Sequence, residues 1–150
     1  MKKLVATLLP TLLIVGVACA KKEPPPAPVA APATTLPAPV SVSAVTLGKA
    51  VGADKKVNAP ADVFGANDTI YASVETAGTG HARLRALWSF VRGEKTAKVD
   101  DTTIEFDSTA PATNEFHVVK PSGWPKGDYR IELFLGDATA PAMTRTFKVS

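Results

Sequence analysis

The sequence contains one cysteine and two histidines, and its N-terminal hydrophobic run, residues 4–17, is too short to cross a membrane as a helix. A single cysteine excludes an intramolecular disulfide and any multi-cysteine metal or redox motif. The 17 Lys+Arg residues are nearly balanced by 14 Asp+Glu, for a formal net charge of +3. No basic stripe remains to predict a nucleic-acid partner. A length of 150 residues predicts one ordinary domain.

The first residues of the chain have the layout of an export signal. A short basic start precedes the apolar run, and the small or apolar residues 16–18 stand immediately before Cys19. This end resembles the lipobox of bacterial lipoproteins, although the usual leucine three positions before the cysteine is replaced by Gly16. The resemblance implies a signal peptide over residues 1–18, lipidation of Cys19 and attachment to a membrane through that lipid. An ordinary secretory cleavage site is the alternative.

The residue after the cysteine indicates whether a lipoprotein stays at the inner membrane or goes to the outer membrane. Ala20 follows Cys19, where an aspartate would be associated with retention at the inner membrane. The resemblance therefore implies the outer membrane of a Gram-negative envelope, with the domain facing the periplasm. Removal of Lys2 and Lys3 with the signal would leave 15 basic and 14 acidic residues, so the net charge would be close to +1.

Residues 19–40 are expected to form a disordered linker that is rich in proline and alanine. Seven prolines fall between Pro24 and Pro39, and they prevent both helix and sheet formation. Such a stretch favours polyproline II at about 3.1 Å per residue, so roughly twenty residues would extend up to ~60 Å. A proline-rich ligand for an aromatic groove is the alternative to a simple spacer.

Residues 41–150 show the alternation of apolar and polar residues that is typical of β-strands. Short runs with this period are separated by Gly, Pro, Asn and Asp about every ten residues, and no long segment has helical periodicity. The pattern predicts an all-β fold, an antiparallel β-sandwich of about seven strands. The expected strands are residues 42–47, 69–75, 83–91, 103–107, 115–119, 129–135 and 144–149.

Two aromatic residues sharpen this prediction. The segment Trp124-Pro-Lys-Gly-Asp-Tyr129 has proline and glycine at the positions favoured in a type I turn. Tyr129 then opens a strand, as the tyrosine corner of immunoglobulin domains does, and Trp88 lies in the middle of a strand like their core tryptophan. The chain thus resembles a disulfide-free immunoglobulin-like domain, similar to small modules of exported bacterial proteins. The resemblance implies a binding or accessory unit and no activity.

A search for catalytic and metal-binding constellations finds none, so the sequence predicts neither an enzyme nor a cofactor. His81 lies in a glycine-rich turn and His117 is expected to point outward from a strand, and both are interpreted as surface histidines. Asp100 and Asp101 lack the spacing of a calcium loop, so a solvated turn is favoured over a weak calcium site. No nucleophile elbow or phosphate-binding loop is present.

Two surfaces remain as candidates for binding. The predicted outward positions of two strands carry apolar residues beside arginines, which is typical of a protein interface. We call this set the partner face: Arg83, Arg85, Leu87, Arg130 and Phe134. The linker or residues 47–66 covering this face is the alternative. The second candidate is a ligand loop at the end of the sandwich that contains His81 and Trp124, where Trp124 either stacks on a sugar or packs over that end.

The sequence therefore favours a membrane-anchored lipoprotein. Its immunoglobulin-like domain is expected to act as a non-catalytic protein-binding or accessory module in the bacterial cell envelope, with an envelope protein as partner. The lipid would hold the chain at the membrane, and the linker would set how far the domain can reach. Tethering raises the effective concentration of the domain near its partner, so even weak binding would be effective. The alternative is direct binding of a glycan or other small ligand through the sandwich-end loops.

Overall fold

The computed structural model describes residues 38–109 and 111–150. No helix in these residues is long and apolar enough to span a membrane. The predicted signal peptide, Cys19 and residues 20–37 of the linker lie outside the described residues. The strands are β1 (Ser41–Gly48), β2 (Val63–Phe64), β3 (Ile70–Ala77), β4 (Gly80–Arg92), β5 (Lys95–Ser108), β6 (Ala112–Val118), β7 (Gly127–Leu135) and β8 (Met143–Val149).

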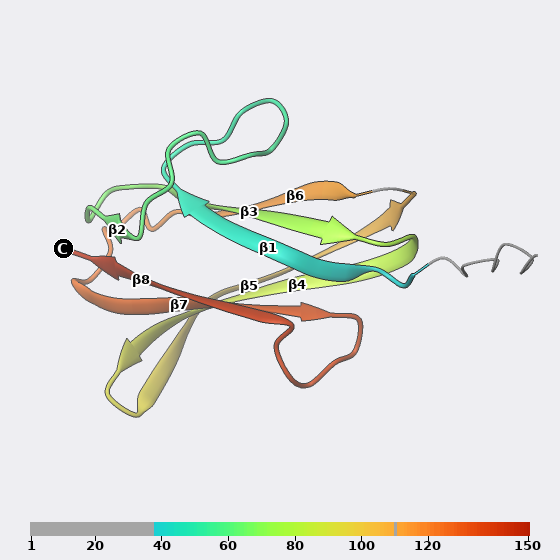
Figure 1. Ribbon diagram of the computed structural model, residues 1–150. Helices are drawn as coiled ribbons and strands as arrows, with labels where there is room; N and C mark the ends of the chain where they lie inside the picture. The colour runs from blue at the N-terminus through green and yellow to red at the C-terminus, as the bar shows by residue number, and fades with distance from the viewer. Residues whose placement is uncertain (1–37, 110) are drawn as a thin grey trace, which may run out of the picture. The chain divides into compact units, whose positions relative to one another are not determined.

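The strands form two facing sheets (Figure 1). One sheet has three strands in the order β1-β3-β6, and the other has five in the order β2-β8-β7-β4-β5. Every pairing is antiparallel except that of β2 with β8. The prediction of an immunoglobulin-like β-sandwich is therefore confirmed, with eight strands in place of seven. The additional strand, β2, has only two residues, too few to show any alternation in the sequence.

The core lies between the sheets because alternate residues of each strand point inward. In β7 the inward residues Ile131 and Leu133 are fully buried, and in β4 so are Leu84 and Ala86. Each buried leucine or isoleucine contributes about 1.5–3 kcal/mol to folding through the hydrophobic effect. The three-stranded sheet supplies the opposing wall, and its most deeply buried members are Leu47, Ile70, Ala72, Val74 and Phe116.

The aromatic residues that carried the immunoglobulin resemblance occupy the expected places. Trp88 is 1% exposed in the core, with its ring edge-on to Phe147 at 5.9 Å between centroids. Tyr129 stacks on the other side of the core, 5.3 Å from the ring of Phe147. Its hydroxyl donates a hydrogen bond of 2.7 Å to the carbonyl oxygen of Pro125, which makes the tyrosine corner.

The β4–β5 hairpin is longer than the sequence predicts. The two strands continue to a tight turn at Gly93, whose φ of 60° is in the left-handed region. The first half of β5 has no alternating apolar residues, because β5 is the edge strand of its sheet and most of its residues are exposed. A register shift between Trp88 and Ser89 adds a residue to β5 and increases the local twist.

The segment between β1 and β2 lies over the outer face of the three-stranded sheet (Figure 1). The hydroxyl of Ser73, on β3, donates to the carbonyl oxygen of Lys55. Lys56 Nζ lies 3.7 Å from a carboxylate oxygen of Glu75, the next outward residue of β3. The segment therefore does not cover the partner face, which belongs to the other sheet.

Candidate functional site

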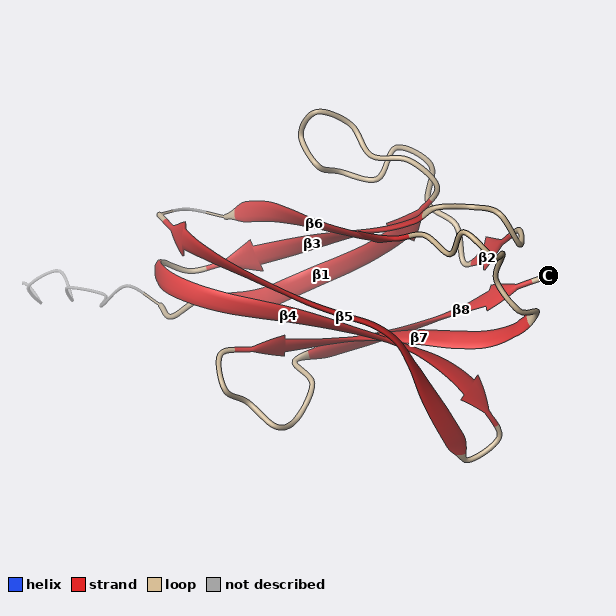
Figure 2. Cartoon of the chain, turned by 180° about the vertical axis from the view of Figure 1, so that it is seen from behind, coloured by secondary structure: helices blue, strands red, loops and turns tan. Residues whose placement is uncertain are grey.

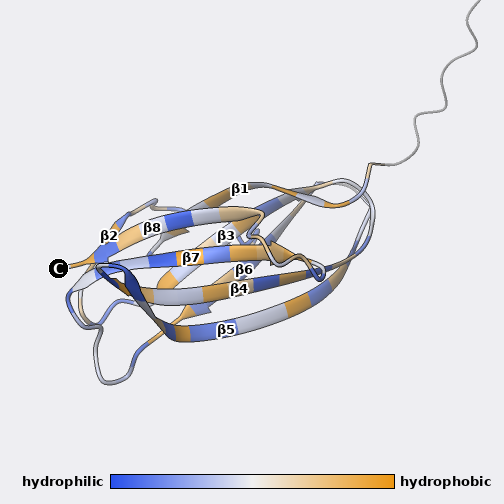
Figure 3. Ribbon diagram, turned by 90° about the horizontal axis from the view of Figure 1, so that it is seen from below, coloured by the Kyte–Doolittle hydropathy of each residue, from blue (hydrophilic) through white to orange (hydrophobic). Residues whose placement is uncertain are grey.

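The partner face lies on the outer side of the five-stranded sheet. Arg83, Arg85 and Leu87 come from β4, and Arg130 and Phe134 come from β7. The two strands are neighbours, and Arg85 is the direct cross-strand partner of Phe134. Hydrophilic and hydrophobic residues alternate along the strands of this sheet, since successive residues point to opposite sides (Figure 3). Leu87 and Phe134 are both half-buried, so the apolar part of the face is smaller than a fully exposed patch would be.

Arg85 is held by a bidentate ion pair with β5. Its Nε and a terminal nitrogen donate to the two carboxylate oxygens of Asp101 at 2.6 and 2.8 Å. These hydrogen bonds lower the pKa of Asp101 below its ordinary value and raise the pKa of Arg85. The Arg85 guanidinium also lies 5.4 Å from the centre of the Phe134 ring, a cation–π contact.

The other two arginines of the partner face are paired as well. Arg83 donates to the carboxylate of Asp137, which follows β7. Arg130 Nε lies 3.0 Å from a carboxylate oxygen of Glu132 on the same strand. Each arginine of the face is therefore neutralised within the chain, and the face does not select a partner by charge alone.

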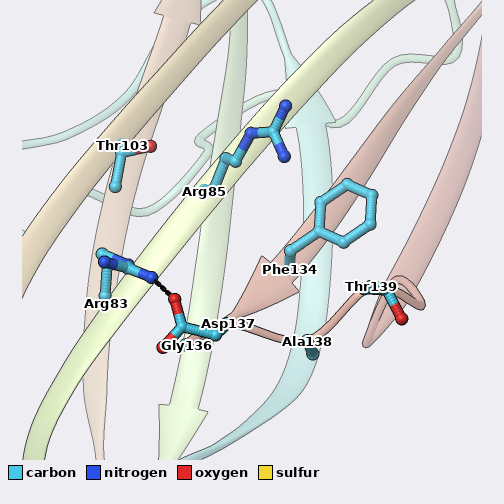
Figure 4. A pocket seen from close by; sticks show the side chains of 8 residues that line it. All are labelled: Arg83, Arg85, Thr103, Phe134, Gly136, Asp137, Ala138 and Thr139. Atoms are coloured by element: carbon cyan, nitrogen blue, oxygen red, sulfur yellow. Dashed lines mark hydrogen bonds and ion pairs between the residues drawn. The ribbon is translucent and has the colours of Figure 1, made fainter.

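A hollow of about 560 Å³ opens at one end of the partner face (Figure 4). Its floor is the surface of β4, β5 and β7, and its wall is the loop that joins β7 to β8. This loop and the β4–β5 hairpin both extend on the side away from the three-stranded sheet (Figure 2). The residues that line the hollow are Arg83, Arg85, Thr103, Phe134, Gly136, Asp137, Ala138 and Thr139.

A second hollow of about 450 Å³ adjoins the first. The two share Arg83, Gly136 and Asp137, so the Arg83–Asp137 ion pair forms the divide between them. The second hollow is also lined by Pro39 and Val40, where the chain enters β1. The first hollow is lined by residues of β4, β5, β7 and the β7–β8 loop, and the entering chain does not line it.

The structure separates the two residues of the predicted ligand loop. Trp124 is 3% exposed, and its indole nitrogen donates to the carbonyl oxygen of Asp68 at 2.8 Å. It closes the end of the sandwich where β7 begins and presents no exposed ring for stacking. His81 is near the start of β4, beside the end of β7, and pairs with Asp107 at 3.0 Å. The two residues therefore lie at opposite ends of the domain, because β4 and β7 are antiparallel.

The other titratable side chains that the sequence singled out form no metal site. Among residues 38–109 and 111–150, no group of three His, Cys, Asp or Glu residues could hold a metal ion. Asp101 is engaged by Arg85, and Asp100 accepts a hydrogen bond of 2.7 Å from Thr102. His117 pairs with Glu115 at 2.9 Å on the outer face of β6.

Sequence reasoning missed the part of the hollow that lies outside the partner face. Thr103 has no feature that marks it in the sequence, and Gly136-Asp137 is visible only as a turn signal. Asp137 faces the hollow because the β7–β8 loop folds back beside β4, where the backbone nitrogen of Gly136 donates to the carbonyl oxygen of Arg83 at 2.7 Å. The only signal in the sequence was that Asp137 follows closely on the strand that carries Phe134 and ends at Leu135.

No protein-family model and no curated protein matches the sequence. Among solved structures, a β-glucosidase from Erythrobacter marinus is similar with a TM-score of 0.52 and 8% identity; the match covers 75% of this chain and 15% of that one. An immunoglobulin-like protein from Pseudomonas aeruginosa is similar with a TM-score of 0.48 and 17% identity, over 75% of this chain and 98% of that one. At these identities the likeness concerns the fold alone, an immunoglobulin-like β-sandwich.

Proposed function

We propose that this chain is a lipid-anchored, non-catalytic accessory module of the bacterial cell envelope that binds an envelope protein through the partner face. In this proposal the lipid on Cys19 holds the chain in the outer membrane, and the proline-rich linker carries the domain into the periplasm. No cofactor and no nucleic acid take part. The domain binds a partner and holds it near the membrane, and any catalysis is carried out by that partner.

The observation that carries the proposal is that no described segment covers the partner face. Within residues 47–66, the segment that was the alternative cover, Lys55 and Lys56 contact β3 of the other sheet, and β2 lies at the edge of the five-stranded sheet beyond β8. Leu87 and Phe134 therefore remain half-buried at the surface, surrounded by arginines whose charges are already paired. An apolar centre with an ordered polar surround is typical of protein interfaces.

The fold comparison supports an accessory role. This chain covers only 15% of the β-glucosidase from Erythrobacter marinus that it resembles in fold, so a sandwich of this kind is a small part of that enzyme. A fold does not define a function. The comparison supports the idea that such a sandwich serves beside other machinery.

Photo-crosslinking in cells tests the protein partner directly. A photoreactive amino acid is placed at Leu87 or at Phe134, with a matched probe at Lys56, which lies over the other sheet. We expect one dominant envelope protein to be captured from the face and not from Lys56. Equal, scattered capture from all three positions would contradict a protein partner.

Membrane fractionation tests the anchor separately. Cys19→Ser removes the only thiol that lipid could modify. We expect the variant to move from the membrane fraction to the soluble fraction of the periplasm, because the acyl chains supply the membrane affinity. Retention of the variant in the membrane would contradict lipid anchoring while leaving the partner face untested.

A further inference from the structure

The hollow at the end of the partner face has the size and construction of a small-ligand site. Its volume of about 560 Å³ falls within the range of about 300–1,000 Å³ that is usual for ligand pockets. Its lining combines one aromatic ring with a few polar groups, as such pockets do. Phe134 supplies the ring, and Arg83, Arg85 and Asp137 supply charged groups on one side of it (Figure 4).

The wall of the hollow is fixed by backbone hydrogen bonds. The nitrogen of Gly136 donates to the carbonyl oxygen of Arg83 at 2.7 Å, which joins the loop to the neighbouring strand. The nitrogen of Ala142 donates to the carbonyl oxygen of Leu133 at 2.7 Å and closes the other end of the loop. The site is therefore formed before any ligand arrives, and binding need not pay for ordering the loop.

The charges of the hollow cancel. Two guanidinium groups, of Arg83 and Arg85, are each paired with one carboxylate, of Asp137 and Asp101. A charged ligand would have to compete with one of these groups for its partner, and the competition is strongest at Arg85, which Asp101 holds through two hydrogen bonds. An uncharged ligand can join both pairs without disrupting them.

The groups that remain free suit a polyol. A guanidinium carries five N–H donors, and Arg85 uses only two of its nitrogens for Asp101. In the part of the chain that the structure describes, the hydroxyls of Thr103 and Thr139 at the edges of the hollow have no hydrogen-bond partner. Donors and acceptors thus stand side by side, which matches adjacent sugar hydroxyls, since each hydroxyl both donates and accepts.

An extended peptide fits the hollow less well. β4 lies between β5 and β7, and β7 lies between β4 and β8, so the backbone groups of these two strands are used within the sheet; β5, which contributes Thr103, is an edge strand whose free edge points away from β4. A peptide that binds by adding a strand needs free backbone groups at a sheet edge. The floor of the hollow offers side chains only.

From these observations we propose that the hollow binds a neutral oligosaccharide, with a sugar ring against Phe134 and its hydroxyls hydrogen-bonded to Arg83, Arg85 and Asp137. Aromatic rings provide a large apolar surface for the C–H face of a sugar. The inference goes beyond the proposed function, because it requires neither the lipid anchor nor a protein partner. Because Arg83, Arg85 and Phe134 belong both to the hollow and to the partner face, a sugar and a protein partner would compete for them.

Nuclear magnetic resonance titration of the full chain, in a detergent without a sugar headgroup, tests this site. The probes are three neutral tetrasaccharides, of glucose in β-1,4 linkage, glucose in α-1,4 linkage and N-acetylglucosamine, each added to about 20 mM, since weak binding is expected for so open a site. We expect at least one to give saturable shifts confined to the amides around Arg85, Thr103, Phe134 and residues 136–139. Absence of saturable shifts with all three, or shifts elsewhere, overturns the inference.

Matched variants and a charged probe sharpen the test. Phe134→Ala is expected to weaken binding about tenfold through loss of the ring contact, whereas Leu87→Ala, on the same face but outside the hollow, leaves the affinity within about twofold. Equal weakening by both variants would overturn the assignment to the hollow. So would equally tight binding of tetragalacturonate, which is acidic. If the photoreactive probe at Leu87 captured an envelope protein and no sugar bound, this inference would be overturned and the proposed function would stand.

Discussion

The hydroxyl of Tyr129 donates a hydrogen bond of 2.7 Å to the carbonyl oxygen of Pro125, four residues earlier in the chain. The bond closes the turn that leads into β7, and the same ring stacks on Phe147 and meets the edge of Trp124. The side chain of Tyr129 thus contacts the turn, the core residue Phe147 and Trp124, which closes the end of the sandwich. Arg130, the first partner-face residue of β7, follows Tyr129 directly in the chain.

Tyr129→Phe is expected to lower the free energy of unfolding by about 1 kcal/mol, the usual net value of one such hydrogen bond. The aromatic packing is kept, so the loss reports on the hydroxyl alone. Urea denaturation followed by tryptophan fluorescence measures it. Tyr71→Phe is the matched control, since the hydroxyl of the half-buried Tyr71 has no hydrogen bond among the described residues. An equal loss in both variants would contradict the role of the corner.

The stability of the domain should fall at alkaline pH through the same residue. Burial raises the pKa of Tyr129 above its ordinary value. A raised folded-state pKa gives stability that is fully present below the unfolded pKa of about 10 and is lost as the pH rises through the folded pKa. Tyr129→Phe cannot titrate, so the stability advantage of the native chain over this variant should shrink between pH 9 and 11. A constant difference across that range would contradict the prediction.

The strands that the sequence predicted are those with the core on one side and solvent on the other, because this arrangement requires apolar and polar residues to alternate. Ile131 and Leu133 face the core, the residues between them face outward, and this difference is written in the sequence as a period of two. The first half of β5 has no such difference, since an exposed edge strand has water on both faces. The first half of β5 forms because the turn at Gly93 brings it beside β4, with which it pairs. Its own sequence has no apolar pattern that would predict a strand.

The site was predictable only where it lies on regular strands. Arg85 and Phe134 were placed on one face by the alternation, and their direct pairing follows from the antiparallel register. Asp137 was not placed, because the path of a loop depends on hydrogen bonds such as that from Gly136 to Arg83. Trp124 was left open between stacking on a sugar and packing, and its burial depends on the carbonyl of Asp68, fifty-six residues away in the sequence.

The entry of the chain into the domain depends on a glycine that cannot carry a side chain. Gly78 has a φ of 99°, and a Cβ there would lie 2.8 Å from the carbonyl oxygen of Ala38. Gly78→Ala is therefore expected to cost about 3 kcal/mol of stability, from backbone strain and from displacement of residues 38–39. The amide of Thr79, which donates to Ala38 at 2.9 Å, should then exchange faster with solvent.

Gly93→Ala is the matched control for that variant. Gly93 also has a positive φ, of 60°, but a Cβ there would meet no atom within 4 Å. The expected cost is about 1 kcal/mol, from the left-handed conformation alone. Chemical denaturation and hydrogen exchange of both variants measure the difference. If Gly78→Ala were no more harmful than Gly93→Ala, the close approach of the entering chain would have no part in stability.

The ion pair between Arg85 and Asp101 should stabilise the domain at neutral pH and lose this contribution in acid. Hydrogen bonds from Arg85 lower the pKa of Asp101 in the folded chain. A depressed folded-state pKa contributes stability above the unfolded value of about 3.9 and loses it as the pH falls through the folded pKa. Asp101→Asn should therefore be less stable than the native chain at pH 7, and the gap should narrow below about pH 4.

Glu94→Gln is the control for this prediction, because Glu94 is exposed at the tip of the β4–β5 hairpin and makes no ion pair within the described residues. Its stability should follow that of the native chain across the same pH range. The measurement is the urea midpoint from pH 2.5 to 7. A gap between the native chain and Asp101→Asn that persists unchanged at pH 2.5 would mean that shape rather than charge holds Arg85 over the Phe134 ring. The neutrality of the hollow would then no longer be a reason to expect an uncharged ligand.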